Sequence, residues 1–214
     1  MGRESVLARV RQALGSRPER APVPPPLSTS FSTAKSDRAP QVLAELFAKN
    51  LESLAGKCVA VKEISQVAPL VASLLAGKTG VASNAAFLGE CGITGLPNVQ
   101  SGFTDREALR AACATADAGI TSADYALADT GTLVMLSSQE EARLISLLPP
   151  SHIAVFPRAR LLSGLDELLE KLPLPADPSS AMVLITGPSR TADIEQILVR
   201  GVHGPGEVQA IIVG

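Results

Sequence analysis

Apolar runs and amphipathic stretches alternate along most of this chain. Short runs rich in Val, Ile and Leu, typical of buried strands, occupy residues 57–62, 79–83, 119–127, 132–137, 152–156, 182–186 and 208–213. Stretches with apolar residues three and four positions apart, typical of helices, occupy residues 41–55, 65–76, 105–116, 164–172 and 189–200. Strands that alternate with helices form parallel sheets with both faces covered. The pattern therefore predicts an α/β fold with a mostly parallel sheet and helices on both faces.

The first 40 residues follow a different pattern. Val6, Leu7 and Val10 recur at helical spacing, which predicts a short amphipathic helix. Prolines and then a Ser/Thr run follow, a composition typical of weakly structured linkers. We therefore predict an N-terminal amphipathic helix over 1–16, a Pro/Ser-rich linker over 17–40 and an α/β domain over 41–214. The helix either docks on another subunit or folds back onto its own domain.

The end of the strand at 182–186 is the first candidate for a binding site. The apolar run stops at Thr186-Gly187-Pro188, and the helical pattern of 189–200 follows at once. The first N–H groups of a helix have no partner inside it and lie at the positive end of its dipole, so this strand–turn–helix geometry predicts an anion site. Arg190 falls in the first helical turn, where a bound anion would offset its unfavourable interaction with the dipole. We expect the site to be lined by Gly187, Ser189, Arg190, Thr191 and Asp193.

A purely structural reading of the same residues stays open. Ser189 has the side chain of a helix N-cap, and Asp193 is spaced to pair with Arg190 on one helical face. In that case the segment is a well-capped helix that binds nothing.

A second candidate is the turn between the strands at 119–127 and 132–137. Gly131 supplies the positive φ that a tight turn requires, so Asp129-Thr130-Gly131-Thr132 predicts a hairpin. Thr130, Gly131 and Thr132 either complete the crevice around Gly187 and Arg190 or do no more than connect two strands.

Three side chains are candidates for catalysis. Asp129 and Glu90 carry carboxylates, and Glu90 opens an E-x-G-x-x-G pattern found around the nucleophile of some coenzyme A transferases. His152 stands at the entrance of a strand, where a structural role and a proton shuttle are both possible roles. His203 follows the predicted helix at 189–200, which places it at the opposite edge of a parallel sheet from Arg190.

Composition excludes several functional classes. The net charge is −2 and only 3% of residues are aromatic, so neither a basic field nor stacking platforms for nucleic acid are present. No apolar run approaches the roughly 20 residues that span a bilayer, and the N-terminus lacks an apolar signal region, so we expect a cytoplasmic protein. Cys58, Cys91 and Cys113 show no C-x-x-C spacing, so we expect no iron–sulfur cluster and no metal on this chain. The oligomeric state stays open, a homo-oligomer included.

Four motifs together resemble a known family. In order, ADTGTLVML, LLPPSHIAVF, ITGPSRTADIE and GVHGP are similar to segments of the lactate utilization protein C family, whose core is the LUD domain. The resemblance covers most of residues 40–214. It implies a fold similar to the sugar-phosphate isomerase and coenzyme A transferase superfamily. Asp129 stands where relatives often have Glu, and the resemblance assigns no catalytic residue.

The resemblance also implies a function. It indicates a subunit of a bacterial system that oxidises L-lactate to pyruvate, with iron–sulfur clusters on partner proteins. The strand–turn–helix site adds a small anionic metabolite as the expected ligand. Whether this chain itself is the enzyme, as part of an L-lactate oxidoreductase complex, stays open. The alternative is a stand-alone isomerase or transferase that acts on a sugar phosphate or an acyl-coenzyme A, and a third reading is a scaffold that recruits redox subunits through its N-terminal helix.

Overall fold

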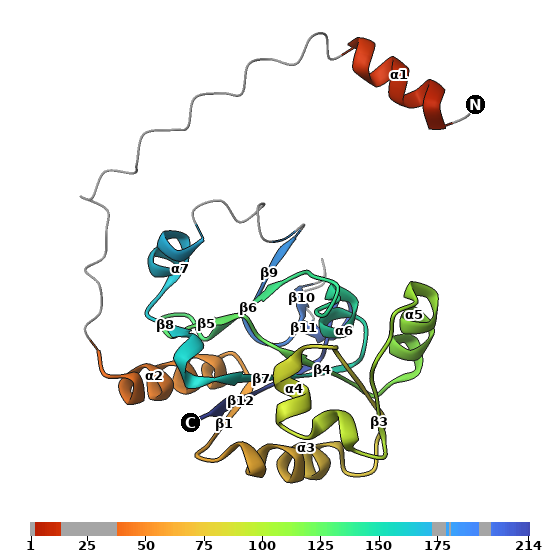
Figure 1. Ribbon diagram of the computed structural model, residues 1–214. Helices are drawn as coiled ribbons and strands as arrows, with labels where there is room; N and C mark the ends of the chain where they lie inside the picture. The colour runs from red at the N-terminus through yellow and green to blue at the C-terminus, as the bar shows by residue number, and fades with distance from the viewer. Residues whose placement is uncertain (1–2, 14–37, 173–178, 180, 193–197) are drawn as a thin grey trace, which may run out of the picture. The chain divides into compact units, whose positions relative to one another are not determined.

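The computed structural model describes residues 3–13, 38–172, 179, 181–192 and 198–214 (Figure 1). The chain divides into two units, Met1–Thr33 and Ala34–Gly214. In the first unit, α1 (Arg3–Ala13) is the helix expected from the spacing of its apolar residues. Most of the predicted linker over 17–40 lies outside the described residues.

A six-stranded sheet forms the centre of the second unit. Its strands are β1 (Lys57–Val61), β2 (Gly80–Ala82), β3 (Val99–Gln100), β4 (Ala118–Ser122), β7 (Ser151–Pro157) and β12 (Glu207–Val213). They lie in the order β1-β12-β7-β4-β2-β3, and every neighbouring pair is parallel. The predicted parallel sheet is therefore confirmed.

A smaller mixed sheet lies against the first. It is built, in the order β8-β5-β6-β9, from β5 (Tyr125–Leu127), β6 (Thr132–Leu136), β8 (Leu161–Leu162) and β9 (Met182–Ile185). β5 and β6 are antiparallel, which confirms the hairpin predicted around Gly131. The single strand predicted over 119–127 is wrong: the chain leaves the main sheet after Ser122, and Asp124 anchors the start of the small sheet by accepting the Leu136 N–H at 2.7 Å.

Helices cover the sheets. They are α2 (Pro40–Ser53), α3 (Val67–Leu75), α4 (Ala86–Glu90), α5 (Arg106–Thr115), α6 (Arg143–Leu147) and α7 (Leu165–Lys171), with short 3₁₀ turns at Ile64–Gln66, Ile93–Gly95 and Arg158–Arg160. The helices predicted over 41–55, 65–76, 105–116 and 164–172 correspond to α2, α3, α5 and α7.

Alternate residues of the central strands build two cores. Ala154 and Phe156 of β7 belong to a cluster with α2 and the small sheet, where the rings of Phe156 and Phe47 meet edge to face at 5.7 Å. Ile153 and Val155 pack on the other side, in a cluster with α3 and the segment that follows β2. Because both faces are covered, β7 reads as a continuous apolar run rather than as an alternating one.

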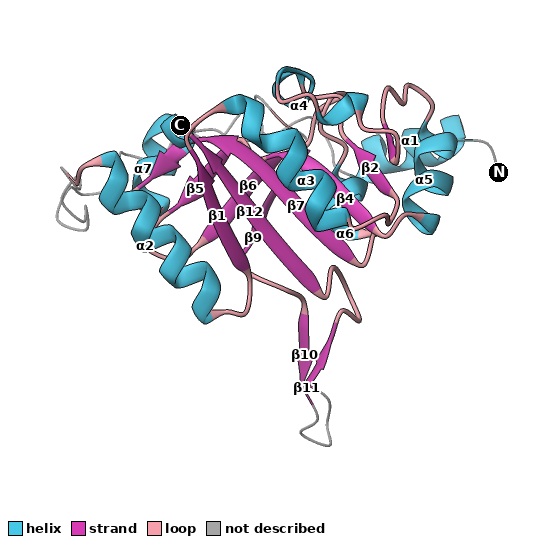
Figure 2. Cartoon of the chain, turned by 90° about the horizontal axis from the view of Figure 1, so that it is seen from below, coloured by secondary structure: helices cyan, strands magenta, loops and turns pink. Residues whose placement is uncertain are grey.

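The helix predicted over 189–200 is wrong. β10 (Arg190–Ala192) and β11 (Leu198–Arg200) form an antiparallel hairpin, which projects beyond the two sheets in Figure 2. Two backbone bonds close its base: the Ser189 N–H donates to Pro205 O at 2.8 Å, and the Gly201 N–H donates to Ser189 O at 3.1 Å. Because of these bonds, the backbone of Ser189 pairs as in a β-sheet and does not begin a helix. Residues 193–197, and Asp193 with them, lie outside the described residues.

Candidate functional site

The two glycine turns singled out in the sequence lie next to each other. The Thr130 and Thr132 hydroxyls are 2.7 Å apart, and the Thr132 hydroxyl lies 2.8 Å from that of Thr186 at the end of β9. The Thr130 hydroxyl also donates to Asp129 Oδ1 at 3.2 Å. A chain of hydroxyl groups thus connects the β5–β6 turn to the segment that carries Gly187.

Both turns pack against the C-terminal end of α2. Asn50 Nδ2 donates to the carbonyls of Ala128 at 2.8 Å and Asp129 at 2.9 Å. Gly131, at φ +67°, approaches the Leu51 backbone so closely that a Cβ would clash with it. Gly187, at φ +84°, lies against Leu54. A Cβ added at Gly187 would lie only 3.0 Å from the Cβ of Leu54. The two glycines are therefore required by close approach as well as by turn geometry.

Arg190 has a partner in the same place. Its Nη2 donates to the carbonyl of Leu54, directly after α2. A cation beside the last carbonyls of a helix interacts favourably with the negative end of the helix dipole. Since Arg190 begins a strand, the helix N-terminus on which its predicted anion binding depended is absent. A ligand-binding role for Thr130, Gly131, Thr132, Gly187, Ser189, Arg190 and Thr191 stays a prediction.

The predicted catalytic candidates are dispersed. Glu90 ends α4 with an exposed side chain, and the exposed Asp129 lies against Gly164. His152 is fully buried in β7. His203 was predicted at the sheet edge opposite Arg190 because a helix was expected over 189–200, and this prediction is wrong. Arg190 pairs with Arg200 across the hairpin, and the exposed His203 lies three residues after Arg200.

A buried carboxylate that the sequence analysis missed lies at the carboxyl ends of the parallel strands. Glu141, 7% exposed, reaches from the segment after β6 to the ends of β2 and β4. Its Oε1 accepts from the Ser83 hydroxyl at 2.7 Å and from the Ser122 N–H at 2.6 Å. Its Oε2 is buried and has no hydrogen-bond partner in the part of the chain that the structure describes.

Two charged side chains lie beside Glu141. Half-buried Arg160, after β7, donates from Nη1 to the Ser122 hydroxyl at 2.9 Å and to the Ala123 carbonyl at 2.7 Å. Its guanidinium carbon lies 5.8 Å from the centre of the Phe87 ring, within the range of a cation–π contact. Asp124 is half-buried between the two sheets. Ligands bind to open α/β sheets at this edge, beyond the carboxyl ends of the strands.

Burial and charge set the protonation of this cluster. Burial raises the pKa of Glu141 to about 7; bonds from Ser83 and Ser122 and the charge of Arg160 oppose the rise, whereas Asp124 adds to it. Burial also raises the pKa of Asp124, against the Leu136 N–H bond and Arg160. A carboxyl with a pKa near 7 exchanges a proton readily at neutral pH.

The sequence carried only a weak signal for this cluster. Glu140 and Glu141 stand together in a polar stretch, and Glu140 is exposed whereas Glu141 is buried. Ser83 stands at the end of an apolar run, but Ser122 falls inside the strand predicted over 119–127, so the sequence did not bring the two serines to one sheet edge.

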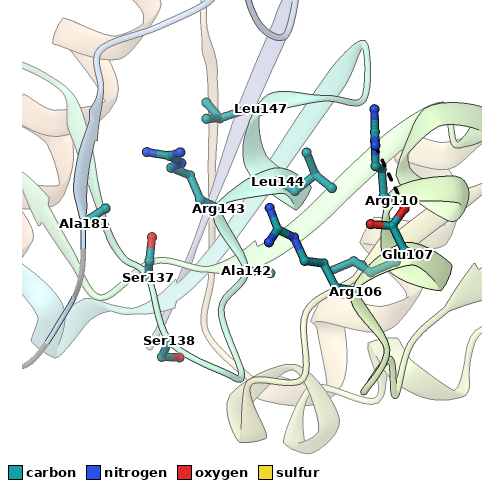
Figure 3. Close-up of a pocket in the computed structure, with 11 residues that line it drawn as sticks. Arg106, Glu107, Arg110, Ser137, Ser138, Ala142, Arg143, Leu144, Leu147 and Ala181 are labelled. Carbon is teal, nitrogen blue, oxygen red and sulfur yellow. Dashed lines mark ion pairs between the residues drawn. The ribbon is translucent and has the colours of Figure 1, made fainter. Parts of the chain in front are cut away.

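A positively charged hollow shares the segment that carries Glu141. Its volume is about 830 Å³, and it is lined by Arg106, Glu107, Leu109, Arg110, Ser137, Ser138, Ala142, Arg143, Leu144, Leu147 and Ala181. Figure 3 shows Arg106 and Arg143 extending into it, while Arg110 lies 3.9 Å from Glu107 in an exposed ion pair. The three arginines outnumber the one acidic side chain of the lining, so the hollow is positively charged.

The three thiols lie apart, in different hydrophobic clusters. Burial, with the Glu52 charge, raises the pKa of Cys58 to about 12, and burial with Glu90 raises that of Cys91 to about 11. Burial raises the pKa of Cys113 as well. Metal and cluster ligation requires thiolates, which these environments disfavour. Among the described residues, no group of three or more His, Cys, Asp or Glu side chains is placed to hold a metal ion.

None of the helices in the described ranges combines the length and apolar character needed to cross a membrane.

Comparison with known proteins identifies related chains. The LUD domain family model matches residues 44–213. Lactate utilization protein C of Halalkalibacterium halodurans is 42% identical over 114 residues, which cover 51% of this chain and 50% of that protein. The protein of the same name from Bacillus subtilis is 39% identical over 102 residues, 46% of this chain and 42% of that one. The chain thus spans about half the length of the curated relatives it matches.

A solved structure shares the fold. The crystal structure of a DUF162 family protein from Deinococcus radiodurans superposes with a TM-score of 0.63 at 19% identity, over 83% of this chain and 99% of that chain. At this identity the likeness concerns the fold alone.

Proposed function

The chain belongs to the LUD domain family, and on that premise we propose that it is a subunit of a lactate utilization system. The observation that carries the proposal is the 42% identity over 114 residues to a protein named lactate utilization protein C, and the match of the LUD domain model to residues 44–213 supports it. The matched region contains both glycine turns and the Glu141 cluster.

The reaction we propose for the system is the oxidation of L-lactate to pyruvate. This oxidation releases two electrons and two protons, so an electron acceptor is required. We propose that iron–sulfur proteins supply it as partners of this chain. The raised thiol pKa values and the separation of the three cysteines support this division of labour, because a cluster requires several thiolates in one place.

A small anionic metabolite is the proposed ligand of this subunit. The turn residues predicted to bind it offer hydroxyl groups that already bond one another, and Arg190 already bonds Leu54. An anion at this place would have to displace those bonds. Thermal shifts on adding lactate, pyruvate or phosphate to wild type and to Arg190→Ala test the role of Arg190, and equal shifts in both proteins exclude it.

The stand-alone isomerase or transferase has less support. The carboxylates expected to serve it are Glu90 and Asp129; Glu90 is exposed at the end of a five-residue helix, and Asp129 is exposed as well. Turnover of a sugar phosphate or an acyl-coenzyme A by the isolated chain, lost in Glu90→Gln, would revive it.

Gene deletion and affinity purification together test the proposed function. Deletion is expected to abolish growth of the source cells on L-lactate as sole carbon source, and the wild-type gene is expected to restore it. The tagged chain from lactate-grown cells is expected to carry iron and lactate-dependent dye reduction, both absent from the recombinant chain. Unimpaired growth of a deletion strain that has no other lactate dehydrogenase would refute the proposal.

A further inference from the structure

The buried carboxylate of Glu141 is only half engaged. Oε1 accepts two hydrogen bonds, from Ser83 and Ser122, while Oε2 accepts none from the described residues. A buried oxygen without a partner is unfavourable, so Oε2 either carries the proton of the neutral acid or meets an atom that is not part of this chain. The two bonds to Oε1 fix the direction in which Oε2 points.

Arg160 has a free edge and is joined to Glu141 through Ser122, which bonds both side chains. Nη1 is used by Ser122 and Ala123, whereas Nη2 makes no hydrogen bond to the residues that the structure describes. Arg160 acts on the protonation of both Asp124 and Glu141, yet within the described ranges it forms no ion pair of 4.0 Å or less with either carboxylate. The free edge of a guanidinium is suited to a planar carboxylate.

The charges of Glu141, Asp124 and Arg160 determine which ligands this cluster can bind. Asp124 and Arg160 are the charged groups that act on Glu141, and with Glu141 ionised the three side chains sum to one negative charge. An anion that enters this half-buried place meets net repulsion unless Glu141 is neutral. Binding of an anion is therefore coupled to the uptake of a proton.

We propose that Glu141, Asp124 and Arg160 form a proton-coupled site for a small monocarboxylate with a 2-oxo or 2-hydroxy oxygen. The ligand carboxylate lies on Nη2 of Arg160, and its 2-oxygen meets Oε2 of Glu141. One proton from solvent converts the Glu141 carboxylate to the acid as the anion binds, so the charge of the cluster and its ligand is unchanged. The ligand class rests on the proposed function; the proton coupling rests on the side chains alone.

Calorimetric titration of the full chain tests the site. L-lactate and pyruvate are added at pH 8 in HEPES and in Tris, whose ionisation enthalpies differ, so that the difference in heat counts protons. For wild type we expect the uptake of nearly one proton and an affinity that falls about tenfold for each pH unit above 7. Glu141→Gln is expected to bind without proton uptake and independently of pH, and Arg160→Gln is expected not to bind. Glu140→Gln, at the exposed neighbour, is the matched control and should behave as wild type.

A second variant keeps the test decisive if Glu141→Gln does not fold. Ser83→Ala removes one donor to Oε1, which destabilises the ionised acid, so the pH at which proton uptake is half-maximal should rise. Binding without proton uptake in wild type, uptake unchanged in Glu141→Gln, or no binding of either acid at millimolar concentration would each overturn the proposal. If proton-coupled binding is found but the deletion strain grows on lactate, the site stands and the lactate system falls.

Discussion

Thr121 and His152 are hydrogen-bonded between β4 and β7, with 2.8 Å between Oγ1 and Nε2, in a place from which solvent is excluded. The Nδ1 atom of the same ring is buried and has no partner among the described residues. Burial disfavours the imidazolium and lowers the pKa of His152 to about 4. The ring is therefore neutral at pH 7.

This pairing predicts an acid-sensitive stability. In the unfolded chain His152 is protonated below about pH 6.5, whereas in the folded chain it stays neutral down to about pH 4. The folded state is therefore destabilised as the pH falls between these two values. The loss amounts to about 3 kcal/mol in the free energy of unfolding. Urea unfolding between pH 7.5 and 4 measures it, and His152→Gln, which keeps an amide near Nε2, should lack this component. An identical pH slope in both proteins would contradict the assignment.

Glu141 predicts a dependence of the opposite sign. Its pKa is 4.5 when unperturbed and about 7 in the fold, so the folded chain holds the proton more tightly, and stability falls as the pH rises from 4.5 to 7. The expected loss is again about 3 kcal/mol, and it partly cancels the His152 effect in wild type. Only the variants separate the two contributions to stability. As the pH rises toward 6.5, Glu141→Gln should become more stable and His152→Gln should become less stable. Parallel curves for the two variants would be inconsistent with these pKa values.

Substitution of Gly131 tests the contact between the β5–β6 turn and α2. Gly131→Ala adds a Cβ at positive φ against the backbone of Leu51 and should destabilise the fold by about 3 kcal/mol or more. Gly77→Ala is the matched control, since Gly77 has φ +84° with no atom within 4 Å of the new Cβ, and only backbone strain of about 1 kcal/mol is expected. Equal losses in the two variants would mean that the turn does not press on α2.

The thiols should react slowly in the folded chain. With its pKa near 12 instead of 9.0, Cys58 is expected to react with an aromatic disulfide reagent at pH 8 roughly a thousandfold more slowly than a free thiol. All three cysteines should react quickly once guanidinium unfolds the chain. A thiol that reacts at the free rate in the native protein would show an environment unlike the one described.

The sequence predicted the strands whose apolar runs reflect burial. It failed where the local pattern of apolar residues did not reveal which strands pair in the fold. β7 and β12, buried on both faces, were evident as apolar runs. The segment after Ser189 satisfied the helical spacing with only a few apolar residues, and the bonds to Pro205 and Gly201 that make it a hairpin could not be anticipated from local spacing. The strand over 119–127 failed for a similar reason, because nothing local shows that its halves belong to different sheets.

The candidate site shows the same limit at the level of single residues. The sequence left open whether the Thr130–Thr132 turn lies beside Gly187, and the structure places the two turns together through the hydroxyls of Thr132 and Thr186. Glu141 differs from its exposed neighbour Glu140 only in what it meets after folding, namely Ser83 and Ser122, 58 and 19 residues away in the chain. Its chemistry is a product of tertiary structure.

The position of β12 between β1 and β7 bears on how the protein is made. β1 lies at the edge of the sheet, and among the strands that the structure describes β12 is its only neighbour there. During synthesis, β1 emerges from the ribosome long before β12 is made. At about 5–20 residues per second, roughly 7 to 30 seconds separate the synthesis of β1 from that of β12. A premature stop before Glu207 would leave both β1 and one side of β7 unpaired, open edges of the kind that chaperones shield and proteases attack.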